Sequence, residues 1–93
     1  MHQLNLRAAV MAYIEASGAK PKLFEHIVRE TWKETMGSTI AEKTESVYLH
    51  GRVCYITVSS SPLRAELGYV REKIKTKFNE ALKEPYVEDV VIR

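Results

Sequence analysis

The sequence predicts an α/β protein of the α+β two-layer sandwich type, with a three-stranded mixed sheet and helices on one face. Two observations lead to this class. Apolar residues alternate with period two between positions 47 and 59, which is typical of half-buried strands. In most of the remaining chain they recur every three or four residues, as on amphipathic helices. The expected order is helix, helix, strand, strand, helix, strand, in a single domain over residues 1–93.

The N-terminal part of the chain predicts two helices. Apolar residues recur every four positions from residue 6 to 14, and Gly18 suits the left-handed residue that ends a helix. Pro21 fits the first turn of a second helix. That helix carries two adjacent apolar rows: Leu23, Ile27 and Thr31, beside Phe24, Val28, Trp32 and Met36. Gly37 interrupts this pattern, so we expect the regular helix to be disturbed there.

Two strands joined by a tight turn are predicted next. A short strand covers residues 47–50, and His50-Gly51 is typical of a hairpin turn because glycine tolerates positive φ. The following strand extends from about residue 52 to 59. Its inward face is expected to carry Cys54, Ile56 and Val58.

A long helix and a final strand complete the predicted fold. Ser61 can cap this helix and Pro62 can begin it, and it continues to about Leu82. Its apolar stripe consists of Leu63, Leu67, Val70, Ile74 and Phe78. Glu84-Pro85 ends the helix, and residues 86–92 are rich in β-branched side chains. A helical crossover between the second and third strands permits parallel pairing.

Composition and charge narrow the class of protein. Cys54 has no partner cysteine, so no intramolecular disulfide is possible and a reducing cytoplasm is expected. The apolar stretch at residues 4–14 is interrupted by polar residues and is too short for a membrane span, so no membrane partner is expected. Fourteen Lys and Arg against twelve Asp and Glu leave a net charge of only +2. Any case for nucleic-acid binding therefore depends on where the basic residues lie.

No residue pattern indicates catalysis, a cofactor or a small-molecule substrate. His2, His26 and His50 lack the spacing of metal ligands. Ser59-Ser60-Ser61 lacks the GxSxG pattern of a serine nucleophile, and a helix cap explains these serines better. The four glycines form no phosphate-binding loop. The sequence therefore predicts a protein that is not an enzyme and binds no metal.

Basic residues concentrate in the C-terminal half. On one continuous helix, Arg64, Arg71 and Lys75 would fall within about 60° of one another, beside the apolar stripe. Such a row is often only a solvated helix face, with Glu72 and Glu80 offering partial pairing. The functional alternative is contact with nucleic-acid phosphates. The candidates for that role are Arg52, Arg64, Arg71, Lys73, Lys75 and Lys77.

Three aromatic residues have two interpretations each. Trp32 has the helical spacing of a core residue, and the alternative is a stacking platform for bases. Tyr48 and Tyr55 fall on the strand face opposite the core, which is open if helices cover one side only. They are candidates for stacking or for binding a protein partner, and a plain cross-strand pair is the alternative.

From Ile27 onward the chain resembles the DciA-like family, bacterial proteins associated with loading or operating the replicative DNA helicase. The resemblance covers about two-thirds of the chain, in the family's order. It is carried by Trp32-Lys-Glu-Thr-Met-Gly37, Ile40-Ala41, Thr44, Cys54-Tyr-Ile-Thr-Val-Ser-Ser60, Leu63-Arg-Ala-Glu-Leu67, Asn79 and Val90-Val-Ile-Arg93. It implies a KH-like domain, DNA binding and interaction with the replicative helicase. The chain departs from true KH domains because it lacks their GxxG loop.

These observations together predict a non-enzymatic, cytoplasmic, DNA-binding protein associated with the replicative helicase, in which DNA is favoured over RNA. Two alternatives remain open. One is an RNA-binding, ribosome-associated KH-like protein. The other is a protein-interaction module that docks through Tyr48, Tyr55 and the hairpin. Self-association through an exposed edge strand is also open.

Overall fold

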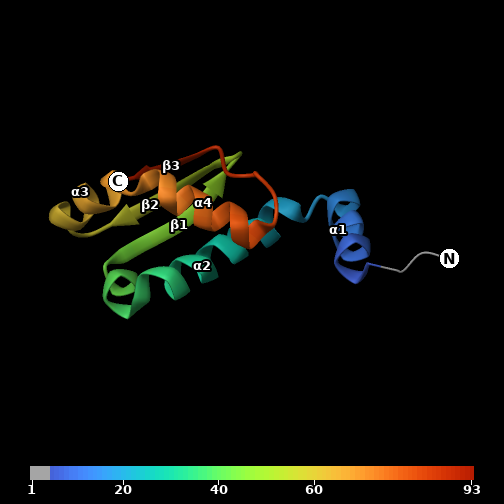
Figure 1. Cartoon of the computed structure of the whole chain (residues 1–93), viewed down its shortest axis with the longest axis horizontal. Coiled ribbons are helices and arrows are strands. Elements are labelled where there is room, and N and C mark those ends of the chain that lie inside the picture. Colours follow the sequence, from blue (N-terminus) through green and yellow to red (C-terminus); the bar gives the residue numbers. More distant parts are fainter. Residues whose placement is uncertain (1–4) are drawn as a thin grey trace.

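The structure, a computed structural model, describes residues 5–93, so His2 lies outside the described residues. Within residues 5–93 the chain forms four helices and three strands in the expected order, with the last predicted helix divided in two (Figure 1). The helices are α1 (Leu6–Ser17), α2 (Lys20–Glu42), α3 (Ser61–Tyr69) and α4 (Arg71–Leu82). The strands are β1 (Thr44–His50), β2 (Val53–Val58) and β3 (Asp89–Ile92).

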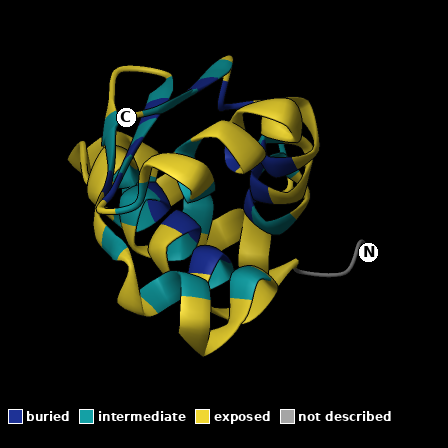
Figure 2. Cartoon of the chain, turned by 90° about the vertical axis from the view of Figure 1, so that its left-hand side faces the viewer, coloured by how far each residue is buried: buried dark blue, intermediate teal, exposed yellow. Residues whose placement is uncertain are grey.

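The sheet has the strand order β1-β2-β3 and is mixed, as the sequence predicts. β1 pairs with β2 in antiparallel orientation, and Tyr48 lies opposite Tyr55. β2 pairs with β3 in parallel, because the chain returns through α3 and α4 before it re-enters the sheet. α2 and α4 cover one face of the sheet and leave the other open (Figure 2). The prediction of an α+β sandwich with helices on one face is confirmed.

The core lies between the sheet and the helix pair α2–α4. The inward face of β2 is buried as expected, with Cys54 and Ile56 fully enclosed. α2 contributes Phe24, Val28 and Trp32, and α4 contributes Ile74, Phe78 and Leu82. The ring of Phe24 packs edge-on against Tyr86, which precedes β3. These buried apolar contacts are the main source of stability in a domain of this size.

The predicted single helix over residues 61–82 is wrong, because the chain breaks between α3 and α4. Val70 has φ −110° and ψ 17°, and its N–H donates to Leu67 in the tight turn that ends α3. Gly68, Tyr69 and Val70 have lower helix propensity than Leu67 and Arg71 on either side, which favours a break here. The cap is Ser60 rather than Ser61, since the Ser60 hydroxyl accepts from the Leu63 N–H at 3.2 Å.

Two turns and the last strand also differ in detail from the prediction. The hairpin loop consists of Gly51 and Arg52 rather than His50 and Gly51, and Gly51 adopts φ 62°. Gly37 disturbs α2 as expected, with φ 81° and ψ 174° inside the helix. β3 begins at Asp89, not at residue 86. The residues before it are held instead by the side-chain amide of Asn79, which makes two hydrogen bonds to Val87.

α1 forms over the predicted residues, but its apolar row is largely exposed. Leu6 is 72% exposed and Val10 is 49% exposed, and α1 has no buried residue. α1 contacts the N-terminal half of α2 and projects from one end of the molecule (Figure 1). No helix within residues 5–93 combines the length and the apolar character that crossing a membrane requires.

Burial of the Cys54 thiol leads to a pH-dependent stability. Desolvation, with the nearby Glu25 charge, raises the pKa of Cys54 from its ordinary value of 9.0 to about 12. The folded state therefore keeps the proton that the unfolded state loses above pH 9. We expect the free energy of unfolding to fall by about 1.4 kcal/mol per pH unit from pH 9 toward pH 12. Urea unfolding at pH 8 and pH 10 measures this decline.

Other groups also titrate in alkali, so a matched variant is needed. Cys54→Val keeps an apolar side chain of similar size and removes the thiol. Its stability should decline less between pH 8 and pH 10 than that of the original chain. Equal declines would contradict the assignment to Cys54, as would rapid reaction of the native thiol with a thiol reagent at pH 8.

Candidate nucleic-acid interface

The structure separates the six basic residues that the sequence singles out. Arg52 lies in the hairpin loop, immediately before β2. Arg64 lies on α3, and its Nη2 donates to the carbonyl of Val58 at the opposite end of β2, at 3.4 Å. Because β2 has six residues, these two ends are about 17 Å apart. The break at Val70 also removes the single-helix relation between Arg64 and the basic residues of α4, so the predicted continuous row is wrong.

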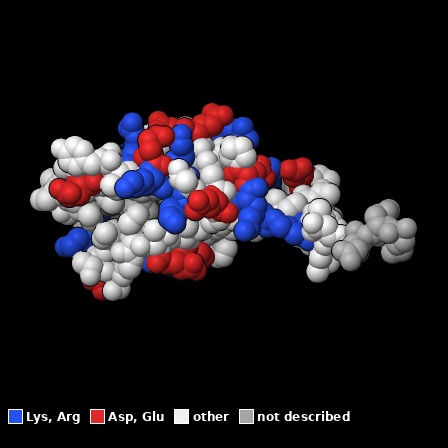
Figure 3. Space-filling view, viewed as in Figure 1, with Lys and Arg blue, Asp and Glu red and all other residues white. Residues whose placement is uncertain are grey.

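Four of the six candidates are paired with carboxylates. The pairs are Arg52–Glu88 at 3.5 Å, Arg71–Asp89 at 3.9 Å, Lys75–Glu72 at 3.1 Å and Lys77–Glu80 at 3.7 Å. Figure 3 shows acidic and basic side chains interspersed over the face that carries α4. Exposed pairs of this kind contribute only about 0–1 kcal/mol each. They nevertheless leave Lys73 as the one basic residue of α4 without an ion pair among residues 5–93.

A different basic cluster forms where β2 ends. The backbone carbonyl of Lys43 accepts from the Ser59 N–H at 2.9 Å. The backbone carbonyl of Arg93 accepts from the Val58 N–H at 2.8 Å. The guanidinium of Arg64 reaches the same strand end. Among residues 5–93, none of these three basic side chains takes part in an ion pair. We call Lys43, Arg64 and Arg93 the basic strand end.

Sequence reasoning missed Lys43 and Arg93, although the sheet topology contains the signal that identifies them. Lys43 directly precedes β1, and Arg93 directly follows β3. The start of β1 meets the end of β2 because the two strands are antiparallel. The end of β3 meets the end of β2 because those strands are parallel. Basic residues that flank these strands therefore converge in space.

Tyr48 and Tyr55 lie on the open face and contact each other. Their ring centroids are 5.3 Å apart and their planes differ by 18°, which is a stacked cross-strand pair. The Arg93 guanidinium lies 4.7 Å from the Tyr55 ring and 5.7 Å from the Tyr48 ring, and it donates to the Tyr48 hydroxyl. The tyrosine pair is therefore joined to the basic strand end through Arg93.

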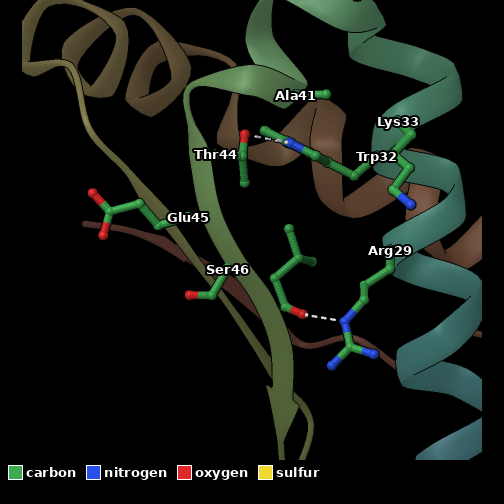
Figure 4. Close-up of a pocket in the computed structure, with 8 residues that line it drawn as sticks. Arg29, Trp32, Lys33, Ala41, Thr44, Glu45 and Ser46 are labelled. Carbon is green, nitrogen blue, oxygen red and sulfur yellow. Dashed lines mark hydrogen bonds between the residues drawn. The ribbon is translucent and has the colours of Figure 1, made fainter.

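Trp32 belongs to the core. Its side chain is only 2% exposed, and its indole N–H donates to the Thr44 hydroxyl at 2.9 Å. Thr44 in turn donates to the carbonyl of Ile40 at 2.7 Å. A shallow pocket adjoins the indole where α2 approaches β1 (Figure 4). The interpretation of Trp32 as a base-stacking platform is wrong for the folded chain, because its ring is enclosed.

α2 protects the outer edge of β1. Arg29 Nε donates to the Val47 carbonyl at 3.0 Å, as Figure 4 shows. Glu25 accepts from the Leu49 N–H at 3.0 Å and pairs with Arg29 at 2.7 Å. Side chains thus occupy two outward backbone groups of this edge strand, which hinders pairing with the edge of another molecule.

The described part of the chain offers little for metal chemistry. His26 and His50 are both exposed and lie on different elements. Within residues 5–93, no group of three or more His, Cys, Asp or Glu side chains is arranged to hold a metal ion.

The structure is a small α+β fold with basic residues gathered at the end of β2. The family model described as "Dna[CI] antecedent, DciA" matches residues 5–92, nearly the whole chain, and the chain therefore belongs to the DciA family. This is a family of helicase loaders. Membership implies a role in DNA replication in association with the replicative helicase. Searches of curated proteins and of solved structures found no match.

Proposed function

We propose that this chain is a DNA-binding accessory protein of the replicative helicase, which contacts nucleic-acid phosphates through exposed basic side chains. The observation that carries the proposal is the basic strand end, where the backbones of Lys43 and Arg93 and the guanidinium of Arg64 reach the end of β2. None of these three side chains has an ion pair among the described residues. Phosphate contacts of this kind give modest, sequence-independent affinity. As a partner of the replicative helicase, the protein would act in the cytoplasm.

The six residues singled out from the sequence are expected to contribute unequally. Arg64 and Lys73 have no ion pair among residues 5–93, so a phosphate meets their charge directly. The other four would exchange a weak surface pair for a phosphate, with a smaller net gain: Arg52, Arg71, Lys75 and Lys77. Arg64 and Lys73 are therefore expected to contribute most, and of these two only Arg64 also belongs to the basic strand end.

Replacing Arg64 by glutamate tests this proposal. Arg64→Glu is expected to weaken binding to a labelled DNA oligonucleotide about tenfold and to lower the salt slope by about one. Lys33→Glu is the matched control because Lys33 lies on α2, outside the six candidates, and is exposed and paired with Glu30 at 3.3 Å. Fluorescence anisotropy at two salt concentrations gives both quantities, and far-UV circular dichroism checks that each variant is folded.

Two outcomes would overturn the proposal. One is DNA affinity that does not change with salt. The other is an Arg64→Glu variant that binds like the original chain.

Competition with RNA of matched sequence decides the nucleic-acid class. If RNA displaces the labelled DNA more readily than unlabelled DNA does, the ribosome-associated alternative is favoured. DNA is favoured because the family acts in DNA replication.

A further inference from the structure

The outward side of α1 carries no charge, which is unusual for a helix on a protein surface. Surface helices place charged or polar side chains toward water, and a helix that is apolar all round is normally buried. Within Leu6–Ser17 the charged residues are Arg7 and Glu15. Arg7 donates to the Leu82 carbonyl at 3.1 Å, and Glu15 pairs with Lys20 at 2.8 Å. Both charges of α1 are therefore engaged with the rest of the domain.

Large and small side chains alternate along this outward side. Leu6 is 72% exposed and Tyr13 is 74% exposed. Ala9 and Ala16 follow each of them at a spacing of three residues and are exposed as well. Val10, 49% exposed, lies beside this row. The spacing of three and four residues is typical of a seam between two helices. We call Leu6, Ala9, Val10, Tyr13 and Ala16 the α1 apolar face.

The apolar surface continues from α1 onto α2. A shallow groove separates the two helices, and its apolar lining consists of Leu6, Val10, Met11, Ile14, Leu23 and Ile27. α1 projects from one end of the molecule, so no other element of the described chain covers this side (Figure 1). Contiguous apolar surface of this kind marks an interaction site rather than a plain solvated face.

The absence of charge favours a second copy of the chain as the occupant. Helices that bind lipid surfaces carry Lys and Arg on their polar side, whereas the two charges of α1 balance each other. At a two-fold axis a surface meets itself, so any charge on it would lie near a like charge. The α1 apolar face avoids this repulsion. It is therefore electrostatically complementary to itself.

The alternation of large and small residues makes the face complementary to itself in shape as well. When two α1 helices run antiparallel with Leu6 of each copy opposite Ala16 of the other, the same register places Tyr13 opposite Ala9. The two-fold axis then repeats each contact. Large side chains face small ones, which is the arrangement that lets packed layers interdigitate. Antiparallel helices also bring opposite ends of their dipoles together.

We infer that the chain associates with a second copy of itself through the α1 apolar face, as an antiparallel pair of α1 helices around a two-fold axis. A helix of 12 residues is about 18 Å long. The interface therefore falls at the small end of specific interfaces, below about 1,200 Å² in total. The expected association is weak, with a micromolar Kd. Because the basic strand end lies at the opposite end of the molecule from α1 (Figure 1), each dimer would carry two of them, far apart.

Sedimentation velocity without DNA tests this inference, from low micromolar to several hundred micromolar chain. The mass of the original chain is expected to rise toward that of a dimer across this range. Ala9→Glu places a charge in the seam and should weaken self-association at least about tenfold, because a buried charge without a partner is costly. Ala65→Glu is the matched control, since it makes the same change at an exposed residue of α3. It should dimerise like the original chain.

Mixing two variants tests the antiparallel register. Tyr13→Lys also places a charge in the seam, so it should be as monomeric as Ala9→Glu when either is studied alone. In an equimolar mixture the new carboxylate of one chain faces the new ammonium group of the other. We expect the mixture to dimerise more strongly than either variant by itself. A mixture that stays monomeric would contradict the register.

Three outcomes would overturn the association with a second copy. One is an original chain that remains monomeric over the whole range, a result that requires no variant to fold. Another is equal self-association of Ala9→Glu and the original chain, with far-UV circular dichroism showing both folded. The third is a monomer that binds phospholipid vesicles and loses this binding in Ala9→Glu, which would assign the face to a lipid surface. DNA is absent from all these measurements, so failure here leaves the proposed function untouched.

Discussion

Trp32→Ala is expected to lower the free energy of unfolding by about 3–5 kcal/mol, because it removes the largest buried side chain of the core. The indole lies between α2 and β1, with its ring centroid 6.3 Å from that of Phe78. Truncation would leave a cavity and would also deprive Thr44 of its indole donor. Domains of this size have a total stability of only about 5–15 kcal/mol, so the loss is a large fraction. Urea unfolding followed by far-UV circular dichroism measures it.

Trp32→Phe separates packing from hydrogen bonding. It keeps an aromatic ring but loses the N–H that donates to Thr44. We expect it to lose about half as much stability as Trp32→Ala, since part of the volume remains. Should Trp32→Ala retain full stability and lose DNA binding instead, the assignment of Trp32 to the core would be wrong.

Asn79→Ala is expected to cost about 2–4 kcal/mol through the loss of two partly buried hydrogen bonds. The Asn79 amide donates to the Val87 carbonyl at 3.0 Å, and its oxygen accepts from the Val87 N–H at 2.8 Å. Val87 is 2% exposed, so water cannot readily replace either bond. The approach of the chain to β3 therefore depends on one side chain of α4.

Thr76→Ala is the matched control for Asn79→Ala. Thr76 is exposed on α4, and its hydroxyl bonds only within the helix, to the carbonyl of Glu72 at 3.0 Å. Its replacement should change the free energy of unfolding by less than about 0.5 kcal/mol. If thermal or urea unfolding shows Asn79→Ala to be equally harmless, the Asn79–Val87 contact does not hold the β3 approach.

The fold was largely predictable from residue patterns because the core of α2 and β2 repeats with clear periods. Phe24, Val28 and Trp32 lie on one helix face, and Cys54, Ile56 and Val58 on one strand face, as expected. The break at Val70 was not predictable from that evidence. Its only signals are weak propensities, and the apolar stripe continues across it from Leu67 to Ile74.

The candidate site was less predictable than the fold because it depends on the ends of three strands. Arg64 was identified from the sequence, whereas Lys43 and Arg93 converge with it only after the strands pair. The ion pairs of the basic residues on α4 were partly visible in the spacing of Lys75 and Glu72. Those formed by Arg52 with Glu88 and by Arg71 with Asp89 depend on the tertiary fold.

α1 shows the limit of hydrophobic periodicity. The spacing of its apolar residues gives the correct helix and the correct end at Gly18. It does not reveal what the apolar side packs against, and in the structure Leu6 and Tyr13 stay mostly exposed. Periodicity predicts that a face is apolar, whereas burial also requires a partner surface.

Direct capture of the replicative helicase is the measurement that bears most closely on the proposed role. The immobilised chain is incubated with purified helicase, with and without nuclease, and the Arg64→Glu variant is treated in parallel. We expect the helicase to be retained after nuclease treatment, by the original chain and by Arg64→Glu alike, because the proposal assigns Arg64 to phosphate contact only. Absence of retention, or retention only while DNA is intact, would contradict a direct association with the helicase.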